Sequence, residues 1–576
     1  MANDHNPSNS IDNYQFLVNT LESWGITMYT GVTGGGVIHF LKHINTLVDE
    51  PTGAPEFLTI GEYEAGFLPL GYFLTSGKIA AAVATTGAAI KLLTCGLSDA
   101  KLHDIPAVYI VPLSGKNTTG FSPLQDTSKY GTNTIDQLRA ELPDSIFILD
   151  NQATLVEQLL LAKAILDDSK PVVLVLVNEV LNTPVTEIPV LPSNKMHSIK
   201  GEHYDSFIDV FRQAVNNKRL VVLVGEEMER YADAKKLTSE LANELHAQTV
   251  WSINGANAVS RDNPYGYGYI SFGGNDKALS LYESLGEDDV LLVLGACPDE
   301  YTTNLAKFKA SHTFYLSNIH HAYGTINNSF QHTANGHYYQ VYGPLDAIIK
   351  QLLHAGRGNP FQNKPGEPAP ANLNDYPYSL PHEGYVNMAD LYQRLDKWWP
   401  AGSIGFDDIC LAYKDRQYVT QRPNDNINFY SLYRGSSMGG AFGAAVGAKL
   451  ANPAKLVALF TGDGCFRLFS GSMGEARNMG VVVFVLNNSA LSIIEQGLKK
   501  ILPDFPEEKY HAYLWPIDYC GVAKACGWDA EKLNSDLSNL DDLLKKMERN
   551  SKQSLLIEVP VDPHQLLGSN PRLKNL

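Results

Sequence analysis

The sequence LVALFTGDG, residues 456–464, followed by VVVFVLNN, residues 481–488, decides the fold of this chain. Each apolar run has the length and composition of a buried parallel strand. The first run ends at Asp463 between two glycines, and the second ends at Asn487 and Asn488. Ligands of open α/β sheets collect at the carboxyl ends of strands, so we expect these polar side chains to meet there.

The residue types at the two strand ends predict a diphosphate-and-metal site. Gly462 and Gly464 let backbone N–H groups approach phosphate oxygens closely. The Asp463 carboxylate, an asparagine amide oxygen and a backbone carbonyl, completed by phosphate and water oxygens, form the octahedral shell that Mg²⁺ requires. A lone GDG tripeptide would be an ordinary βαβ turn, and the asparagine pair favours the metal site instead.

With these motifs the chain resembles, over nearly its whole length, the thiamine diphosphate (ThDP) enzymes of the acetolactate synthase, pyruvate decarboxylase and benzoylformate decarboxylase type. The resemblance implies an α/β protein with three doubly wound parallel-sheet domains. The expected domains are a pyrimidine-binding domain over residues 1–185, a central Rossmann-like domain over 200–353, and a diphosphate- and Mg-binding domain over 380–565. A length of 576 residues suits three cores, and the proline-bearing stretches 183–197 and 354–382 are the expected linkers.

Composition excludes several classes of function. A net charge of −17 argues against nucleic acid and anionic membranes as partners. No apolar run has the length of a membrane span, and the first ten residues lack a signal-peptide pattern, so we expect a cytoplasmic protein. Six cysteines without metal-binding spacing are expected to be reduced thiols. They are Cys95, Cys297, Cys410, Cys465, Cys520 and Cys526.

A second signature lies in residues 58–78, LTIGEYEAGFLPLGYFLTSGK. It resembles the family's catalytic glutamate followed by a helix, and its spacing places Glu62 rather than Glu64 on that position. The resemblance implies that the Glu62 carboxylate exchanges a proton with the pyrimidine ring of ThDP. Such a carboxylate is costly to bury without a hydrogen-bonding partner. The family often has a histidine just before the glutamate, where this chain has Gly61.

Two further segments of the first domain resemble active-site loops of the family. The glycine-rich turn 31–36 follows an expected strand, residues 26–30, and precedes an expected helix, residues 37–47. It resembles the loop that approaches substrate. Residues 124–126, Leu-Gln-Asp, resemble the family's Phe-Gln-Glu and make Gln125 a candidate active-site amide.

The loop of residues 435–440 resembles the family's Gly-x-Met-Gly loop. The resemblance implies that Met438 wedges between the two ThDP rings and that the Ser436 carbonyl accepts from the 4′-amino group. Two sets of residues complete the expected site. The cofactor contacts are Glu62, Ser436, Met438, Gly462, Asp463, Gly464, Cys465, Asn488 and Ala490, and the Mg²⁺ ligands are Asp463, Asn488 and the Ala490 carbonyl.

The roles of three charged residues stay open at this stage. Arg434 either binds a substrate carboxylate or phosphate or forms a surface ion pair. Lys91 stands where a small polar residue is common, as a solvated lysine or a substrate contact. Glu495 faces either the pocket or solvent.

The resemblance implies an enzyme that acts on small molecules, a 2-oxo acid and a second carbonyl or other electrophile. The adjacent histidine pair of pyruvate decarboxylases is absent and only His103 lies nearby in sequence. Protonation of the decarboxylated intermediate needs a placed acid, so we favour an acetolactate synthase-like carboligase. Gly497 stands where acetolactate synthases carry a tryptophan. The alternatives are a non-ligating 2-oxo acid decarboxylase, a C–C hydrolase or lyase, and a catalytically silent ThDP-fold subunit.

The family places ThDP between the first domain of one subunit and the third domain of another. We therefore expect a homodimer or homotetramer. Some members hold FAD in the central domain, where this chain has an aromatic, glycine-rich stretch at residues 265–275. That stretch contains no decisive nucleotide fingerprint, so FAD is the less favoured cofactor and ThDP with Mg²⁺ the expected pair.

Overall fold

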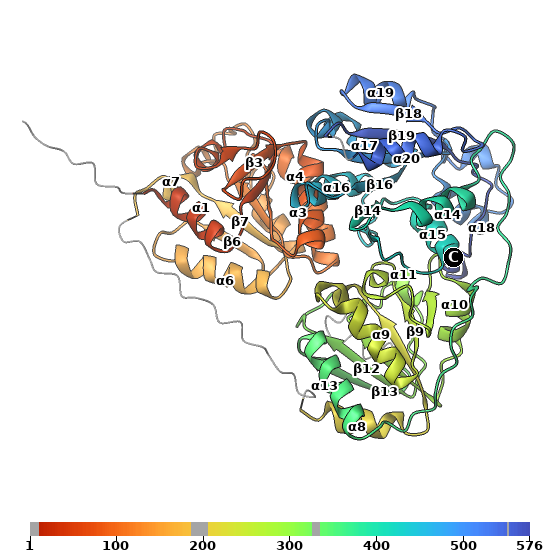
Figure 1. Ribbon diagram of the computed structural model, residues 1–576. Coiled ribbons are helices and arrows are strands. Elements are labelled where there is room, and N and C mark those ends of the chain that lie inside the picture. The colour runs from red at the N-terminus through yellow and green to blue at the C-terminus, as the bar shows by residue number, and fades with distance from the viewer. Residues whose placement is uncertain (1–10, 186–204, 325–333, 550–551, 576) are drawn as a thin grey trace, which may run out of the picture. The chain divides into compact units, whose positions relative to one another are not determined.

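Three parallel β-sheets form the framework of the protein (Figure 1). The computed structural model describes residues 11–185, 205–324, 334–549 and 552–575. The sheets have seven, six and six strands in chain order, which confirms the predicted three-sheet α/β fold. The chain forms two compact units: the first sheet with residues 442–453 makes one, and the second and third sheets make the other.

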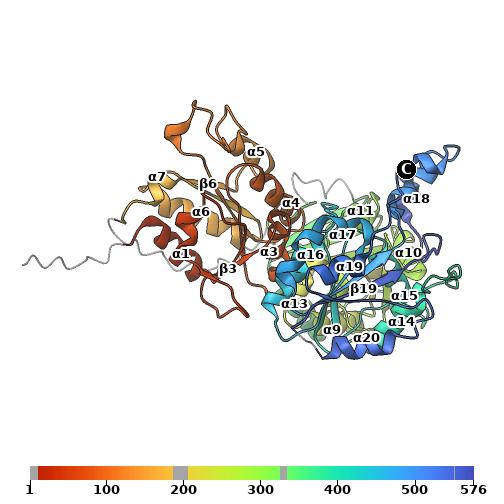
Figure 2. The same cartoon turned by 90° about the horizontal axis from the view of Figure 1, so that it is seen from above.

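The first sheet has the strand order β2-β3-β1-β4-β5-β7-β6. Its strands are β1 Met28–Gly31, β2 Asn45–Thr46, β3 Glu56–Thr59, β4 Ala81–Val83, β5 Val108–Pro112, β6 Ile146–Leu149 and β7 Val172–Leu176. Side chains of α1 (Asn13–Ser23) and α6 (Leu155–Asp167) pack into one hydrophobic core with these strands. Helices α3 (Glu62–Ser76) and α4 (Ala88–Leu102) lie side by side, and Tyr109 of β5 donates to the carbonyl of Gly66 in α3 at 2.9 Å (Figure 2).

One helix of this unit is shorter than the sequence predicts. The helix expected over residues 37–47 is only α2, Ile38–Leu41. Residues 45 and 46 instead form β2 and pair in parallel with Glu56 and Phe57 of β3. The β-branched side chains of Ile44 and Thr46 favour this extended edge, which overrides the helical spacing.

Helix α16 (Gly440–Ala451) packs against α3 through glycines. A Cβ atom at Gly443 would lie 2.3 Å from the carbonyl oxygen of Glu64, and one at Gly71 would lie 1.8 Å from that of Ala444. Only glycine permits backbones to approach so closely. In the sequence this helix lies within the third predicted domain, residues 380–565, but it packs in the first unit (Figure 1).

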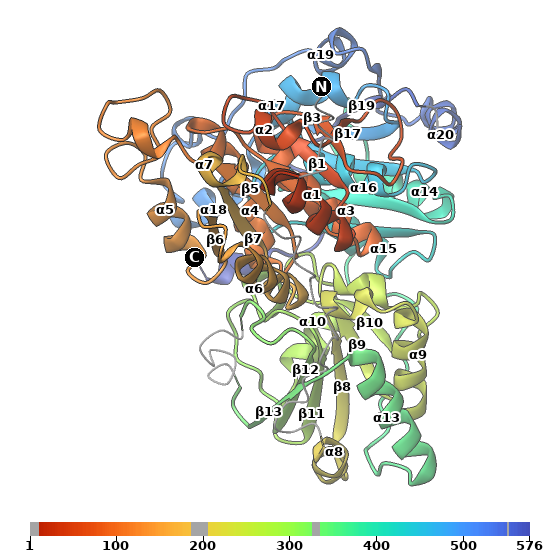
Figure 3. The same cartoon turned by 90° about the vertical axis from the view of Figure 1, so that its left-hand side faces the viewer.

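The second sheet has the order β10-β9-β8-β11-β12-β13. Its strands are β8 Arg219–Val224, β9 Gln248–Trp251, β10 Gly266–Tyr269, β11 Asp289–Leu294, β12 His312–Ser317 and β13 His337–Tyr342. Helices α8 (Phe207–Val215), α9 (Ala234–Leu245) and α13 (Leu345–Gly358) share one core with the sheet, and α9 and α13 lie side by side (Figure 3). Helix α10 (Asp276–Glu283) packs in a second core.

The third sheet has the order β15-β14-β16-β17-β19-β18. Its strands are β14 Ser403–Asp407, β15 Ile427–Ser431, β16 Val457–Gly462, β17 Val481–Asn487, β18 Asp529–Lys532 and β19 Leu555–Pro560. The two strands predicted from residues 456–461 and 481–486 are β16 and β17, and the helix expected at residues 388–398 is α14, Met388–Trp398. From β14 the chain runs to β15 on one side and then to β16 on the other, so the order reverses between β14 and β16.

The cysteines and the lengths of the apolar helices bear on two further expectations. All six cysteines lie in the described part of the chain and none of them forms a disulfide there. Within the described ranges, no helix has both the length and the apolar character needed to cross a membrane.

Candidate functional site

A cavity of about 310 Å³ opens at the carboxyl ends of β14 and β16, where the strand order reverses. Open α/β sheets bind their ligands at such a reversal point. Eight of the predicted site residues line this cavity: Ser436, Met438, Gly462, Asp463, Gly464, Cys465, Asn488 and Ala490. The other two, Glu62 and Gln125, belong to the first unit.

The carboxylate of Asp463 carries an unsatisfied acceptor. Its Oδ1 accepts from the backbone N–H of Gly464 at 2.9 Å, whereas its Oδ2 is buried and has no hydrogen-bond partner among the described residues. Burial raises the pKa of this carboxyl group to about 6. A buried acceptor without a donor is costly, and a divalent cation would satisfy it. The donor set at this position therefore fits Mg²⁺.

The structure distinguishes the two asparagines at the end of β17. Asn487 Nδ2 donates to Glu558 Oε1 at 3.0 Å, and Asn487 does not line the cavity. Asn488 does line it, and its Oδ1 accepts from the Ala490 N–H at 3.0 Å while its Nδ2 donates to Ser492 Oγ at 2.7 Å. An amide oxygen has two lone pairs, so Asn488 Oδ1 retains one for a further ligand. Asn488 is the member of the pair that fits a metal.

Asp408, which the sequence analysis missed, organises the walls of the cavity. Its Oδ1 accepts from the N–H groups of Ile409 at 2.8 Å and Gly439 at 3.0 Å, and its Oδ2 accepts from Thr461 Oγ1 at 2.7 Å. Burial raises the pKa of this carboxyl group to about 6. Asp408 thus joins the ends of β14 and β16 to the loop that carries Met438. Its signal in the sequence was a pair of aspartates directly after an apolar strand.

Glycine and cysteine at residues 464 and 465 have packing roles. A Cβ atom at Gly464 would lie 2.8 Å from Leu491 Cδ2 and 3.2 Å from Met438 Cε, so a larger residue would push Met438 away. Cys465 is 1% exposed, and its Sγ donates to the carbonyl of Ile409 at 3.2 Å. Burial raises the pKa of the Cys465 thiol well above its usual value, so the thiol stays protonated.

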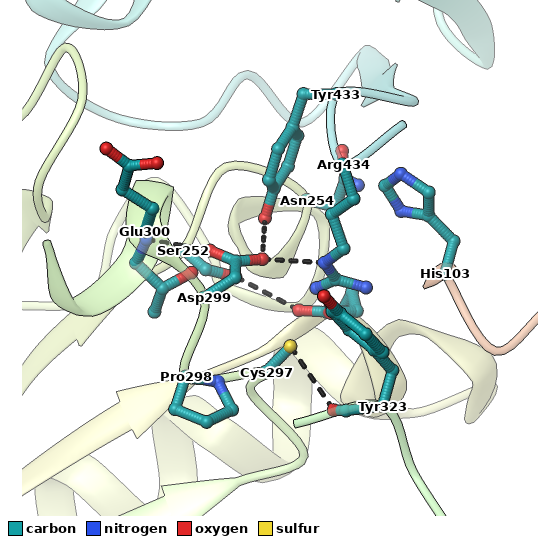
Figure 4. Close-up of polar contacts among 12 residues, drawn as sticks. His103, Ser252, Asn254, Cys297, Pro298, Asp299, Glu300, Tyr323, Tyr433 and Arg434 are labelled. Atoms are coloured by element: carbon teal, nitrogen blue, oxygen red, sulfur yellow. Dashed lines mark hydrogen bonds and ion pairs between the residues drawn. The ribbon is translucent and has the colours of Figure 1, made fainter. Parts of the chain in front are cut away.

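Arg434 is held in a buried ion-pair cluster (Figure 4). Its side chain is 3% exposed, its Nε donates to Asp299 Oδ2 at 2.6 Å, and its Nη2 pairs with Glu226. The hydroxyl of Tyr433 donates to Asp299 Oδ2 at 2.8 Å. Glu226 follows β8 and Asp299 follows β11, so the cluster ties the second sheet to the loop that carries Met438. This resolves Arg434 as an ion-paired residue rather than a surface one.

Lys91 and Glu495 are the other two charged residues whose roles the sequence leaves open. Lys91 is exposed on α4. Glu495 is 8% exposed on α18 (Ser492–Ile501), and Lys499 Nζ lies 3.1 Å from its Oε1. Glu495 is not among the residues that line the cavity.

Glu62 and Gln125 lie at one edge of the first sheet. Glu62 begins α3 directly after β3, and Gln125 Oε1 accepts from Thr86 Oγ1, just after β4, at 2.6 Å. Strand β1 lies between β3 and β4, and its glycine-rich loop follows at the same edge. There a Cβ atom at Gly34 would lie 2.4 Å from Thr85 Oγ1. The predicted residues of this unit therefore converge on the carboxyl edge of its sheet.

Comparison with known proteins identifies the family. Three models match in succession: the thiamine pyrophosphate enzyme N-terminal TPP binding domain over residues 12–140, the central domain over 210–352 and the C-terminal TPP binding domain over 413–559. The chain belongs to the thiamine pyrophosphate enzyme family. Thiamine pyrophosphate is ThDP, so the predicted family and its organic cofactor are confirmed.

Individual relatives extend over nearly the whole chain. The chain is 22% identical over 565 residues to the acetolactate synthase isozyme 1 large subunit of Escherichia coli strain K12, across 96% of this chain and 94% of that protein. It is also 22% identical to the acetolactate synthase large subunit of Lactococcus lactis subsp. lactis strain IL1403, across 95% and 92%. Among solved structures, the thiamine diphosphate-dependent 4-hydroxybenzoylformate decarboxylase of Rhodococcus jostii RHA1 matches with a TM-score of 0.77 and 16% identity, across 96% of this chain and 99% of that one. This last likeness shows a shared fold.

Proposed function

We propose that this thiamine pyrophosphate enzyme is an acetolactate synthase-like carboligase. It would decarboxylate a 2-oxo acid such as pyruvate and transfer the remaining acyl unit to a second carbonyl compound or other electrophile. The observation that carries this proposal is the match to acetolactate synthases across more than nine-tenths of the chain.

The position of His103 supports ligation over simple protonation. Helix α4 begins at the carboxyl edge of the first sheet and ends at Leu102, so His103 lies at the opposite, amino edge. Its ring is 4% exposed and lies 3.7 Å from Asp99 Oδ1. His103 therefore cannot act as the acid beside Glu62 and Gln125 at the carboxyl edge. Without that acid, a second electrophile is the favoured acceptor.

The cofactor site has two parts in the proposal. Residues Ser436, Met438 and 462–465 would hold ThDP, and Asp463, Asn488 and the Ala490 carbonyl would bind Mg²⁺. The unpartnered Oδ2 of Asp463 supports this assignment. When bound, ThDP supplies an electron sink for the loss of CO₂.

Two residues of the first unit would act on protons and substrate. The Glu62 carboxylate would hold the proton that it exchanges with the pyrimidine ring. Gln125 would orient the substrate, because Thr86 engages its amide oxygen and the NH₂ group is the end that can donate to a substrate oxygen.

At the carboxyl edge of the second sheet, Glu227 accepts from Ser317 Oγ at 2.6 Å and from the N–H of Asn318 at 2.6 Å. Glu227 thus joins the turn after β8 to the end of β12. We propose ThDP, without FAD, as the organic cofactor.

The proposal extends to assembly and location. Residues 1–185 would form the domain that binds the pyrimidine ring, residues 200–353 the central domain, and residues 380–565 the domain that binds the diphosphate and Mg²⁺. We propose a homodimer or homotetramer in which two subunits complete each site. Six cysteines without a disulfide among the described residues are compatible with a reducing compartment, and we propose a cytoplasmic location.

The test is release of CO₂ from a panel of 2-oxo acids, pyruvate first, with ThDP and Mg²⁺ and with or without aldehyde and ketone acceptors. We expect one 2-oxo acid to lose CO₂, faster with one acceptor, and Glu62→Gln to abolish this. Glu157→Gln, an exposed glutamate of α6 in the same unit, is the matched control. If CO₂ release needs no acceptor and gives an aldehyde, the enzyme is a non-ligating decarboxylase. If no 2-oxo acid reacts although ThDP binds, decarboxylation itself is wrong.

A further inference from the structure

Two residues that line the cofactor cavity have no part in the site described so far. Tyr301 lies in the short helix α11 (Glu300–Thr303), and Arg572 lies in the C-terminal 3₁₀ helix η7 (Pro571–Lys574). Both belong to the same compact unit as Asp463. They are 271 positions apart in the chain, and Arg572 Nη1 donates to the Tyr301 hydroxyl at 3.1 Å. The two side chains therefore form one polar patch in the wall of the cavity.

Arg572 is the one cationic side chain among the described residues that line this cavity. Its ion-pair partner, Glu300, does not line the cavity and accepts only from Nε, at 2.9 Å. A second N–H group, on Nη1, is taken by Tyr301. The remaining N–H groups of the guanidinium, among them both on Nη2, have no partner among the described residues. The side chain is 32% exposed, so a ligand can reach these donors.

The hydroxyl of Tyr301 also has a donor to spare. Its oxygen accepts from Arg572 Nη1 and from the Tyr413 hydroxyl, the latter at 3.2 Å. Because the oxygen accepts both bonds, the Tyr301 O–H proton is left for an acceptor in the cavity that the residue lines. The ring stacks on Phe272 and on Tyr433, with centroid distances of 4.6 and 4.9 Å. The position of this donor is therefore fixed.

Contacts on both sides of Arg572 hold it at the cavity. Asn304, which follows α11, donates through Nδ2 to the Pro571 carbonyl at 3.1 Å. Its Oδ1 accepts from Asn575 Nδ2 at 2.9 Å. A donor set that is held in place before its ligand arrives loses less conformational entropy on binding. The patch is thus ordered in advance for a ligand.

We propose that Arg572 and Tyr301 form a subsite for an anionic oxygen group inside the cofactor cavity. The free end of a guanidinium and a phenol O–H can together engage the oxygens of a carboxylate or of a phosphate. This inference rests on the proposed function, which brings both groups into the cavity: the carboxylate of the 2-oxo acid and the diphosphate of ThDP. We favour the carboxylate, because Tyr301 stacks on Tyr433, directly before the loop whose Met438 is expected at the ThDP rings. The subsite would then select substrates that carry a negative charge.

The test compares wild type with Arg572→Gln and Tyr301→Phe. Lys574→Gln is the matched control, because Lys574 belongs to the same 3₁₀ helix, is 72% exposed and does not line the cofactor cavity. Calorimetry first measures binding of ThDP with Mg²⁺. On protein saturated with both, it then measures binding of oxamate, an unreactive isostere of pyruvate. We expect unchanged ThDP binding and oxamate binding weakened about tenfold or more in Arg572→Gln, with a smaller loss in Tyr301→Phe. Arg572→Lys should recover part of the loss, because it restores the charge but not the guanidinium geometry.

The two ligands separate the possible sources of the anion. Weaker ThDP binding in Arg572→Gln would assign the subsite to the diphosphate. If Arg572→Gln binds both ligands as wild type does, the proposal is overturned, as it is if wild type does not bind oxamate and ThDP binding is unchanged. In turnover, the KM for the 2-oxo acid should rise about tenfold in Arg572→Gln with little change in kcat, which a general structural defect would not produce. If no 2-oxo acid reacts, the proposed function fails, and the calorimetry still decides whether the subsite exists.

Discussion

Replacement of Arg434 by methionine tests how the second sheet supports the cofactor loop. Methionine keeps much of the volume of the side chain and removes its charge. The carboxylates of Glu226 and Asp299 would then be left without their shared guanidinium, at side-chain exposures of 17% and 10%. Removing one partner from a buried ion pair costs about 3–5 kcal/mol, because the remaining charges stay desolvated. We expect a loss of this size in the free energy of unfolding.

The assay is urea unfolding of the protein without cofactor, followed by circular dichroism. Arg394→Met is the matched control, because Arg394 pairs with Asp541 at 2.7 Å but both side chains are exposed, at 40% and 72%. An exposed pair contributes at most about 1 kcal/mol. Further replacement of both carboxylates, in Arg434→Met/Glu226→Gln/Asp299→Asn, should recover part of the loss. If Arg434→Met destabilises the protein no more than Arg394→Met, the cluster does not stabilise the fold and the reasoning fails.

Three further substitutions test other parts of the account. Asp463→Asn should weaken Mg²⁺-dependent ThDP binding by more than about tenfold in calorimetry, because it removes a charged metal ligand. It should not lower the thermal midpoint of the cofactor-free protein, because the carboxylate that it replaces is buried. Unchanged cofactor binding would remove Asp463 from the metal site. Folding raises the pKa of Glu229 from 4.5 to about 7, mainly through burial beside Tyr430. This carboxyl group therefore costs nothing below pH 4.5 and destabilises the fold increasingly as the pH rises from 4.5 through 7. Glu229→Gln should raise the free energy of unfolding at pH 8 by about 3 kcal/mol and have little effect at pH 4.5, and an equal effect at both pH values would contradict the shift. Gly443→Ala would place a methyl group 2.3 Å from the Glu64 carbonyl and should lower stability by about 1–3 kcal/mol in urea unfolding; a neutral result would show that α16 can move away from α3.

The sequence predicts the parts of the site that depend on short-range order. Asp463 and Asn488 directly follow adjacent parallel strands, and the continuous apolar runs of those strands are enough to predict that both residues reach one cavity. Met438 was predicted because its loop resembles the family's Gly-x-Met-Gly loop. These features need no knowledge of distant segments.

The features that the sequence did not predict join residues far apart in the chain. Arg434 is separated by 208 positions from Glu226, and nothing local to either residue indicates the pairing. Asp408 has only the aspartate pair after an apolar strand as a local signal, and its role becomes clear when the sheet order places Thr461 beside it. The helix expected over residues 37–47 was overestimated because apolar spacing cannot show that an edge strand takes over from it.

The course of α16 affects how this protein can be dissected into fragments. A fragment cut in the first linker, near residue 195, would contain α3 but lack the helix whose glycines fit against it. The complementary fragment would carry α16 with its glycine and alanine surface exposed to water, which favours aggregation. Recombination between related proteins at that linker would likewise separate two surfaces that must match atom by atom. Residues 62–76 and 440–451 therefore have to be inherited and engineered as a pair, although nearly the whole central part of the chain lies between them.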